Sequence, residues 1–94
     1  MRIGEIIGTV TLGRCHPNLS GGSFRLATPL TLANLLGETA ATAEPIVVYD
    51  QLGAGLGGRI AISEGGEAAQ PFRPEIKPVD AYCAAILDSI EVRP

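Results

Sequence analysis

The glycine-rich segment at residues 49–58 constrains the fold of this chain more than any other stretch. Three of its glycines match the G-x-G-x-x-G spacing of dinucleotide-binding loops, and the apolar run 46–49 before them predicts a strand. Such a loop must lead directly into a helix, because the helix N-terminus supplies the free N–H groups that hold a pyrophosphate. Here it leads into residues 59–63, whose apolar side chains two apart predict another strand. We therefore expect a hairpin and not a nucleotide site.

Length and charge argue against other function classes. The 94 residues form one domain, residues 1–94, which is too short for a doubly wound nucleotide fold. A net charge of −3 and the absence of Trp argue against nucleic acid, which is bound by clustered Lys and Arg or by stacking aromatics. No apolar segment is long enough for a membrane helix, and Glu5 interrupts the first apolar stretch, so we expect no membrane partner and no signal peptide.

The surface is undercharged for so small a domain. Charged residues make up 18% of the chain, against roughly 25% in an average soluble domain. The predicted strands at residues 2–14 and 46–49 are apolar on both faces, which indicates that both faces are covered. A chain of this length has no helical layer to cover them. We therefore expect a neighbouring subunit to do so in a stable homo-oligomer.

The pattern of apolar residues predicts an all-β fold. Five segments predict strands: residues 2–14, 24–30, 46–49, 59–63 and a stretch within 86–92. A short helical turn is expected at residues 33–36, ended by Gly37. A helix is also expected from Pro78, which suits the first helical position, with an apolar face at residues 79, 83 and 86. The expectation is a small five-stranded, OB-like β-barrel with one short C-terminal helix.

No group of residues predicts catalysis or a metal site. His16 and Cys15 are adjacent, so on an extended segment they point to opposite faces and cannot easily bind one metal or form a catalytic pair. Asp50, just before the glycine turn, is expected to accept backbone N–H bonds. Cys15 and Cys83 are too few for a disulfide framework and are expected to be small buried thiols. We expect no catalytic residue, no metal and no cofactor.

The glycine segment has two interpretations. Its glycines can supply the positive φ angles of a tight hairpin. Alternatively, Gly53, Ala54, Gly55 and Gly57 allow backbones to approach closely around a symmetry axis, where larger side chains would collide. The pattern itself does not choose between them.

Four segments, in order along nearly the whole chain, resemble one known family. They are RIGEIIGTV at residues 2–10, CHPNLSG at 15–21, VYDQLGAGLG at 48–57, and PVDA at 78–81 with ILDSIE at 86–91. This combination is similar to the vertex proteins of bacterial microcompartments, the EutN/CcmL family of ethanolamine-utilization and carboxysome shells. Two departures are a Cys at position 15, where the family often has a basic residue, and an acidic run at residues 63–68.

The resemblance implies a non-enzymatic structural protein of the bacterial microcompartment shell, in the cytoplasm. Five copies would form a homopentamer that caps a shell vertex and docks edge-on to hexameric microcompartment shell proteins. Candidates for the subunit interface or the five-fold axis are Asp50, Leu52, Gly53, Ala54, Gly55, Leu56 and Gly57; His16 and Pro17 are candidates for a second interface. The alternatives are an OB-like binding module for a small ligand or oligonucleotide, against which the acidic charge counts, and a small Cys-dependent enzyme.

Overall fold

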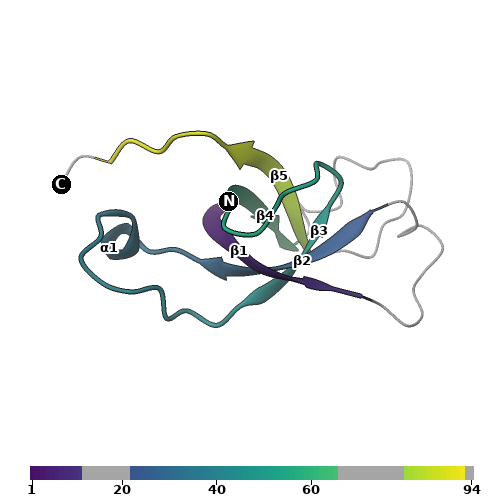
Figure 1. The fold of residues 1–94 in the computed structure, drawn as a ribbon, viewed down its shortest axis with the longest axis horizontal. Coiled ribbons are helices and arrows are strands. Elements are labelled where there is room, and N and C mark those ends of the chain that lie inside the picture. The colour runs from purple at the N-terminus through teal and green to yellow at the C-terminus, as the bar shows by residue number, and fades with distance from the viewer. Residues whose placement is uncertain (12–21, 66–79, 93–94) are drawn as a thin grey trace.

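The computed structural model describes residues 1–11, 22–65 and 80–92. These residues form five strands and one short helix: β1 (Arg2–Val10), β2 (Ser23–Pro29), α1 (Leu32–Leu35), β3 (Ile46–Asp50), β4 (Arg59–Glu64) and β5 (Ala81–Leu87). The strands close into a barrel in the order β1-β2-β3-β5-β4 (Figure 1). The predicted all-β class and the five-stranded barrel are therefore confirmed.

Strand β1 closes the barrel because it pairs on both of its edges. It runs antiparallel to β2 along most of its length and antiparallel to β4 through its first half. A bulge between Ile6 and Gly8 bends the strand just after its pairing with β4 ends, while its pairing with β2 continues. Gly4 lies at a tight crossing, since a Cβ there would come within 2.6 Å of the Ile62 side chain. An ion pair between Arg2 and Glu64 joins the outer ends of β1 and β4.

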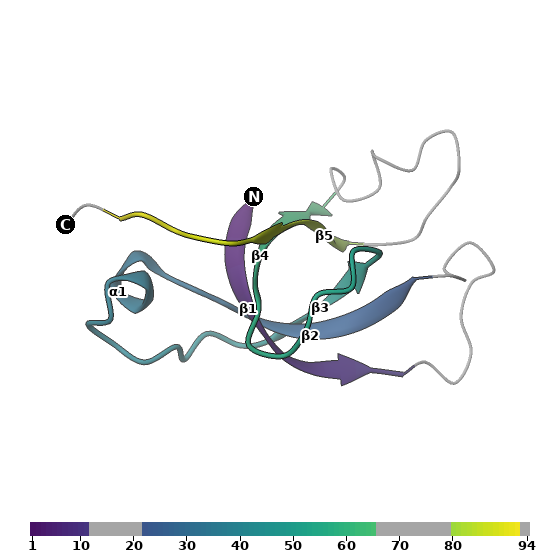
Figure 2. The same ribbon diagram turned by 45° about the horizontal axis from the view of Figure 1, so that its top comes forward.

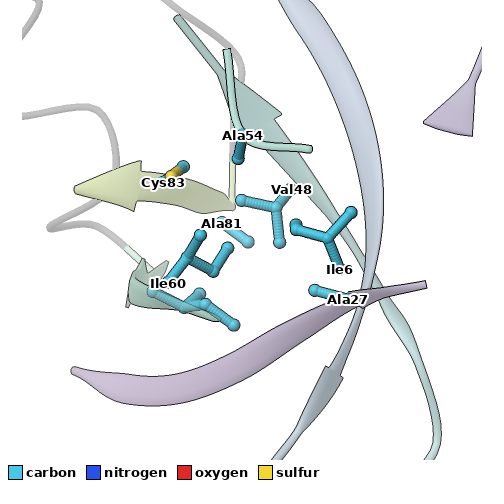
Figure 3. Close-up of a cluster of buried hydrophobic side chains, with 8 residues drawn as sticks. Ile6, Ala27, Val48, Ala54, Ile60, Ala81 and Cys83 are labelled. Carbon is cyan, nitrogen blue, oxygen red and sulfur yellow. The ribbon is translucent and has the colours of Figure 1, made fainter. Parts of the chain in front are cut away.

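The core is made of small and medium apolar side chains that point into the barrel. Its buried members are Ile6, Ala27, Val48, Ala54, Ile60, Ile62, Ala81 and Cys83 (Figure 3). Full burial of a Val or Ile contributes about 1.5–3 kcal/mol each, so the four aliphatic side chains among them supply most of the apolar stabilisation. Ala54 differs from the other core residues because it belongs to the glycine-rich segment and not to a strand.

The predicted hairpin is wrong. Strands β3 and β4 flank the glycine segment but are not neighbours, because β5 lies between them. Strand β5 pairs in parallel with β3 at Tyr49 and Tyr82, and antiparallel with β4 along its length. Local alternation identifies a strand but not its partner, and here closure of the barrel by the last strand decides the pairing. The glycine segment is thus a crossover connection, which passes the end of β5 to join β3 to β4.

The predicted C-terminal helix is also wrong for the part of it that the structure describes, residues 80–87. Residues 81–87 form β5, and the predicted fifth strand at 86–92 overlaps it only at its end. Cys83 and Ile86 do not share one buried face, because Cys83 is buried and Ile86 is 44% exposed. Pairing with β4 satisfies the backbone there, so tertiary pairing overrides the helical pattern. The helical turn predicted at residues 33–36 is confirmed as α1, with Gly37 at a φ of +76° behind it. Residues 12–14 of the predicted first strand and the expected helix start at Pro78 lie outside the described residues.

In the described part of the chain, α1 is the only helix, and its four residues are far too few to cross a membrane.

Candidate subunit interface

The glycine loop, residues 51–58, is anchored at its start by Asp50. The backbone N–H groups of Leu52 and Ala54 donate to the two carboxylate oxygens of Asp50, each at 2.8 Å. Asp50 is only 1% exposed, so these bonds are made away from water. The expectation that Asp50 accepts backbone N–H bonds is confirmed. The carboxylate takes over the role of a strand partner where the chain leaves β3.

The far end of the loop is fixed to β1. The N–H of Gly57 donates to the carbonyl of Ile6 at 2.8 Å, and the N–H of Ile6 donates to the carbonyl of Gly58 at 2.9 Å. Between these two anchors, Ala54 is buried in the barrel core. The loop is therefore held at three points and presents one defined outer surface.

Three of the four glycines are required by the subunit itself. Gly53 and Gly57 have φ angles of +81° and +78°, which L side chains rarely adopt. A Cβ on Gly58 would come within 2.9 Å of the carbonyl oxygen of Gly55. Gly55 is different: its φ is not positive, and among the described residues no atom lies within 4 Å of an added Cβ. The tight-turn interpretation explains Gly53 and Gly57 but leaves Gly55 without a reason inside the subunit.

After the exposed Gln51, the outer surface of the loop is apolar and uncharged. Leu52 is 49% exposed and Leu56 is 73% exposed, and the exposed Gly53, Gly55 and Gly57 lie between and beside them. Between the two exposed leucines lie two glycines and Ala54, whose side chain is buried, so the loop forms a surface that can accept an apolar side chain at close range.

Buried polar groups surround the Asp50 anchor on its inner side. Arg25 Nε lies 3.4 Å from an Asp50 carboxylate oxygen, with the arginine side chain largely buried. The buried Cys83 thiol lies nearby and contacts the carbonyl oxygen of Ala85 at 3.8 Å. Burial, and then the negative charge of Asp50, raise the pKa of Cys83 to about 11. The thiol is therefore protonated at neutral pH, as expected for a structural cysteine.

The structure brings the first set of predicted interface residues together in one loop but divides it into two groups. Asp50 and Ala54 are buried and position the loop. The outer surface is formed by Leu52, Gly53, Gly55, Leu56 and Gly57. A subunit contact at this surface stays a prediction. The second predicted set, His16 and Pro17, lies outside the described residues, as does Cys15.

Sequence reasoning missed two residues that position the loop, Arg25 and Ile6. Arg25 is opposite Val48 in the pairing of β2 with β3, on the inner face of the sheet. The available signal was an arginine at an inward-facing position, because such a charge needs a buried partner. The contribution of Ile6 is made by its backbone and had no sequence signal.

No group of three or more His, Cys, Asp or Glu side chains within residues 1–11, 22–65 and 80–92 is arranged to hold a metal ion.

Comparison with known proteins decides the family. The family model described as "Ethanolamine utilisation protein EutN/carboxysome" matches residues 1–88. The chain belongs to the EutN/CcmL family. Among its relatives, the carboxysome shell vertex protein CcmL of Gloeobacter violaceus is 35% identical over 92 residues, which cover 98% of this chain and 87% of that protein. The microcompartment shell vertex protein GrpN of Rhodospirillum rubrum is 31% identical over 91 residues, or 97% of each chain.

Solved structures of EutN/CcmL proteins have the same fold. The GrpN pentameric microcompartment shell protein from Rhodospirillum rubrum superimposes with a TM-score of 0.80 at 29% identity, covering 99% of this chain and 100% of that one. Gloeobacter violaceus CcmL superimposes with a TM-score of 0.76 at 31% identity, covering 98% and 90%. The five-stranded closed sheet is thus the family fold, and the resemblance inferred from the sequence motifs is confirmed.

Proposed function

We propose that this EutN/CcmL chain is a structural shell protein whose homopentamers cap the vertices of a bacterial microcompartment. The observation that carries the proposal is the similarity to GrpN, a pentameric shell protein, over the full length of both chains. The named vertex proteins CcmL and GrpN support the same role. The protein's work is geometric and not catalytic: five wedge-shaped copies introduce the curvature that a flat hexagonal layer lacks, and their outer edges meet hexameric shell proteins.

The glycine loop is our candidate for the contact between adjacent copies or for the five-fold axis. Gly55 has no steric or conformational requirement within the described part of the subunit, and Leu52 and Leu56 project into water beside it. A neighbouring chain that covers this surface gives both observations a physical reason, because it buries the leucines and leaves no room for a side chain at position 55. The low charge of the chain supports the same interpretation.

A shell-closure assay tests the vertex role directly. The gene is deleted in the host, and the compartments are imaged by electron microscopy with and without a plasmid-borne copy. We expect elongated or open compartments without the protein and closed polyhedra when it is restored. Closed polyhedra of normal shape in the deletion strain would contradict the proposal.

A further inference from the structure

The connection between β2 and β3, residues 30–45, extends away from the barrel as an arm. In Figures 1 and 2, α1 lies at the far end of the molecule, clear of the five strands. No residue of α1 is buried, and every residue from 37 to 45 is exposed. The order of the arm within the subunit must therefore come from its own hydrogen bonds and not from an apolar core.

A helix as short as α1 needs caps at both ends. Helix nucleation is unfavourable, because the first turn fixes several residues for each hydrogen bond that it gains. The first four N–H groups and the last four carbonyl groups of a helix also lack partners within it. In a helix of four residues, every backbone group belongs to one of the two ends. Without a covering surface, α1 therefore depends on caps that supply these partners locally.

The first end of α1 is capped by a reciprocal exchange between Thr31 and Asn34. The Thr31 N–H donates to Asn34 Oδ1 at 2.9 Å, and the Asn34 N–H donates to Thr31 Oγ1 at 3.2 Å, which makes a capping box. The N–H groups of the next two residues, Leu35 and Leu36, donate to the carbonyls of residues 31 and 32 at 3.0 Å each. The first turn is thus closed by both side-chain and backbone bonds.

The second end of α1 is capped by a Schellman motif. The N–H of Gly37 donates to the carbonyl of Asn34 at 3.1 Å, and the N–H of Glu38 donates to the carbonyl of Ala33 at 3.0 Å. This motif needs a residue in the left-handed region, and Gly37 supplies it with a φ of +76°. As a result, the carbonyls of residues 31, 32, 33 and 34 all accept a backbone hydrogen bond.

Asn34 also holds the chain that returns toward β3. Its side-chain amide donates to Thr39 Oγ1 at 3.0 Å and to the carbonyl of Ala40 at 3.1 Å. The side-chain oxygen of Asn34 thus serves the capping box, its backbone carbonyl serves the Schellman motif, and its side-chain nitrogen holds the return. We call the side-chain bonds of Asn34 with Thr31, Thr39 and Ala40 the clasp.

We propose that the tip of the arm, residues 31–40, is a locally determined rigid unit that keeps its conformation without a covering surface, and that its order depends on the Asn34 clasp. Such a unit holds the 60% exposed Leu32 in one place, so it loses little conformational entropy when another surface meets it. The proposal concerns the single subunit. It does not rest on the proposed function, because it holds for a monomer and for any oligomer.

Hydrogen exchange measured by mass spectrometry tests whether the clasp orders the arm. The wild-type protein is compared with Asn34→Ala, which removes the clasp, and with Thr42→Ala, which changes an exposed residue of the same arm outside it. We expect Asn34→Ala to speed the exchange of the amides of residues 34–38 at least about tenfold and Thr42→Ala to leave it within about twofold. The amides of β1 and β4 are the reference for an intact barrel. Equal effects of the two substitutions, or wild-type amides that exchange as fast as in an unstructured peptide, would overturn the inference.

A conservative substitution separates the two halves of the clasp. Asn34→Asp keeps an oxygen that accepts from the Thr31 N–H but loses the amide that donates to Thr39 and Ala40. We expect the amides of residues 35–38 to keep their protection within about threefold, while ¹⁵N relaxation shows faster motion at residues 39–42. Loss of protection as complete as in Asn34→Ala, or unchanged relaxation at residues 39–42, would overturn the role of the clasp. Light scattering on the same samples reads the oligomeric state, so the proposed function stands or fails separately.

Discussion

The Asp50 carboxylate accepts a hydrogen bond from the backbone N–H of Ala54 at 2.8 Å, across the first turn of the glycine loop. This bond places Ala54 in the barrel core, so the conformation of the loop and the packing of the core are set together. The glycine loop is thus a rigid part of the fold, whose outer surface is determined by buried contacts.

Replacing Asp50 with Asn should destabilise the subunit. The amide keeps the shape of the carboxylate but offers one acceptor oxygen in place of two, so one buried N–H loses its partner and Arg25 loses its counter-charge. A buried donor left without a partner costs about 1–3 kcal/mol. Urea unfolding at a fixed protein concentration measures the loss. Glu5→Gln is the control, since its exposed pair with Arg59 is worth less than about 1 kcal/mol, and equal effects of the two would contradict this account.

Gly53 and Gly55 should respond differently to alanine. Gly53 has a φ of +81°, so Gly53→Ala introduces backbone strain of about 1–2 kcal/mol in the folded subunit. Gly55 has neither a positive φ nor a close neighbour, so Gly55→Ala should change the stability of a single subunit by no more than about 0.5 kcal/mol. Thermal unfolding of both variants under dissociating dilution measures the two losses, and equal losses would contradict this account.

Replacing Gly55 with Leu should impair assembly more than folding. The subunit leaves open space at this position, so the barrel should keep its circular dichroism spectrum. If a neighbouring chain covers the loop, the leucine side chain collides with it and the pentamer dissociates at higher concentration. Light scattering distinguishes the outcomes. A Gly55→Leu protein that assembles as tightly as the wild type would mean that the loop serves only as a connection between strands.

The stability of the protein should fall at alkaline pH through Cys83. Its pKa of about 11 in the folded state lies above the value of 9.0 for a free thiol, so the folded protein retains a proton that the unfolded chain has lost. The stabilisation is therefore complete below pH 9 and is lost as the pH rises from 9 to 11, by up to about 2–3 kcal/mol. Urea unfolding of the wild type and of Cys83→Ala at pH 7 and pH 10.5 isolates this contribution. A difference between the two proteins that does not change with pH would contradict it.

The sequence identified strands well where apolar alternation was local, as at residues 46–49 and 59–63, and the strand expected directly after the glycines is present as β4. It failed where the outcome depended on distant pairing. Because β5 lies between β3 and β4, the expected hairpin is instead a crossover connection. Residues 81–87, which were expected to be helical, form β5. The acceptor role of Asp50 was predictable from its place before a turn, whereas its contact with Arg25 required the register of β2 against β3.

The most direct test of the central claim is the mass of the purified wild-type protein in solution, measured by light scattering at micromolar concentration. We predict a single species with five times the 9.7 kDa mass of the chain. A stable monomer, or an oligomer of any other number, would contradict the assignment as a vertex pentamer.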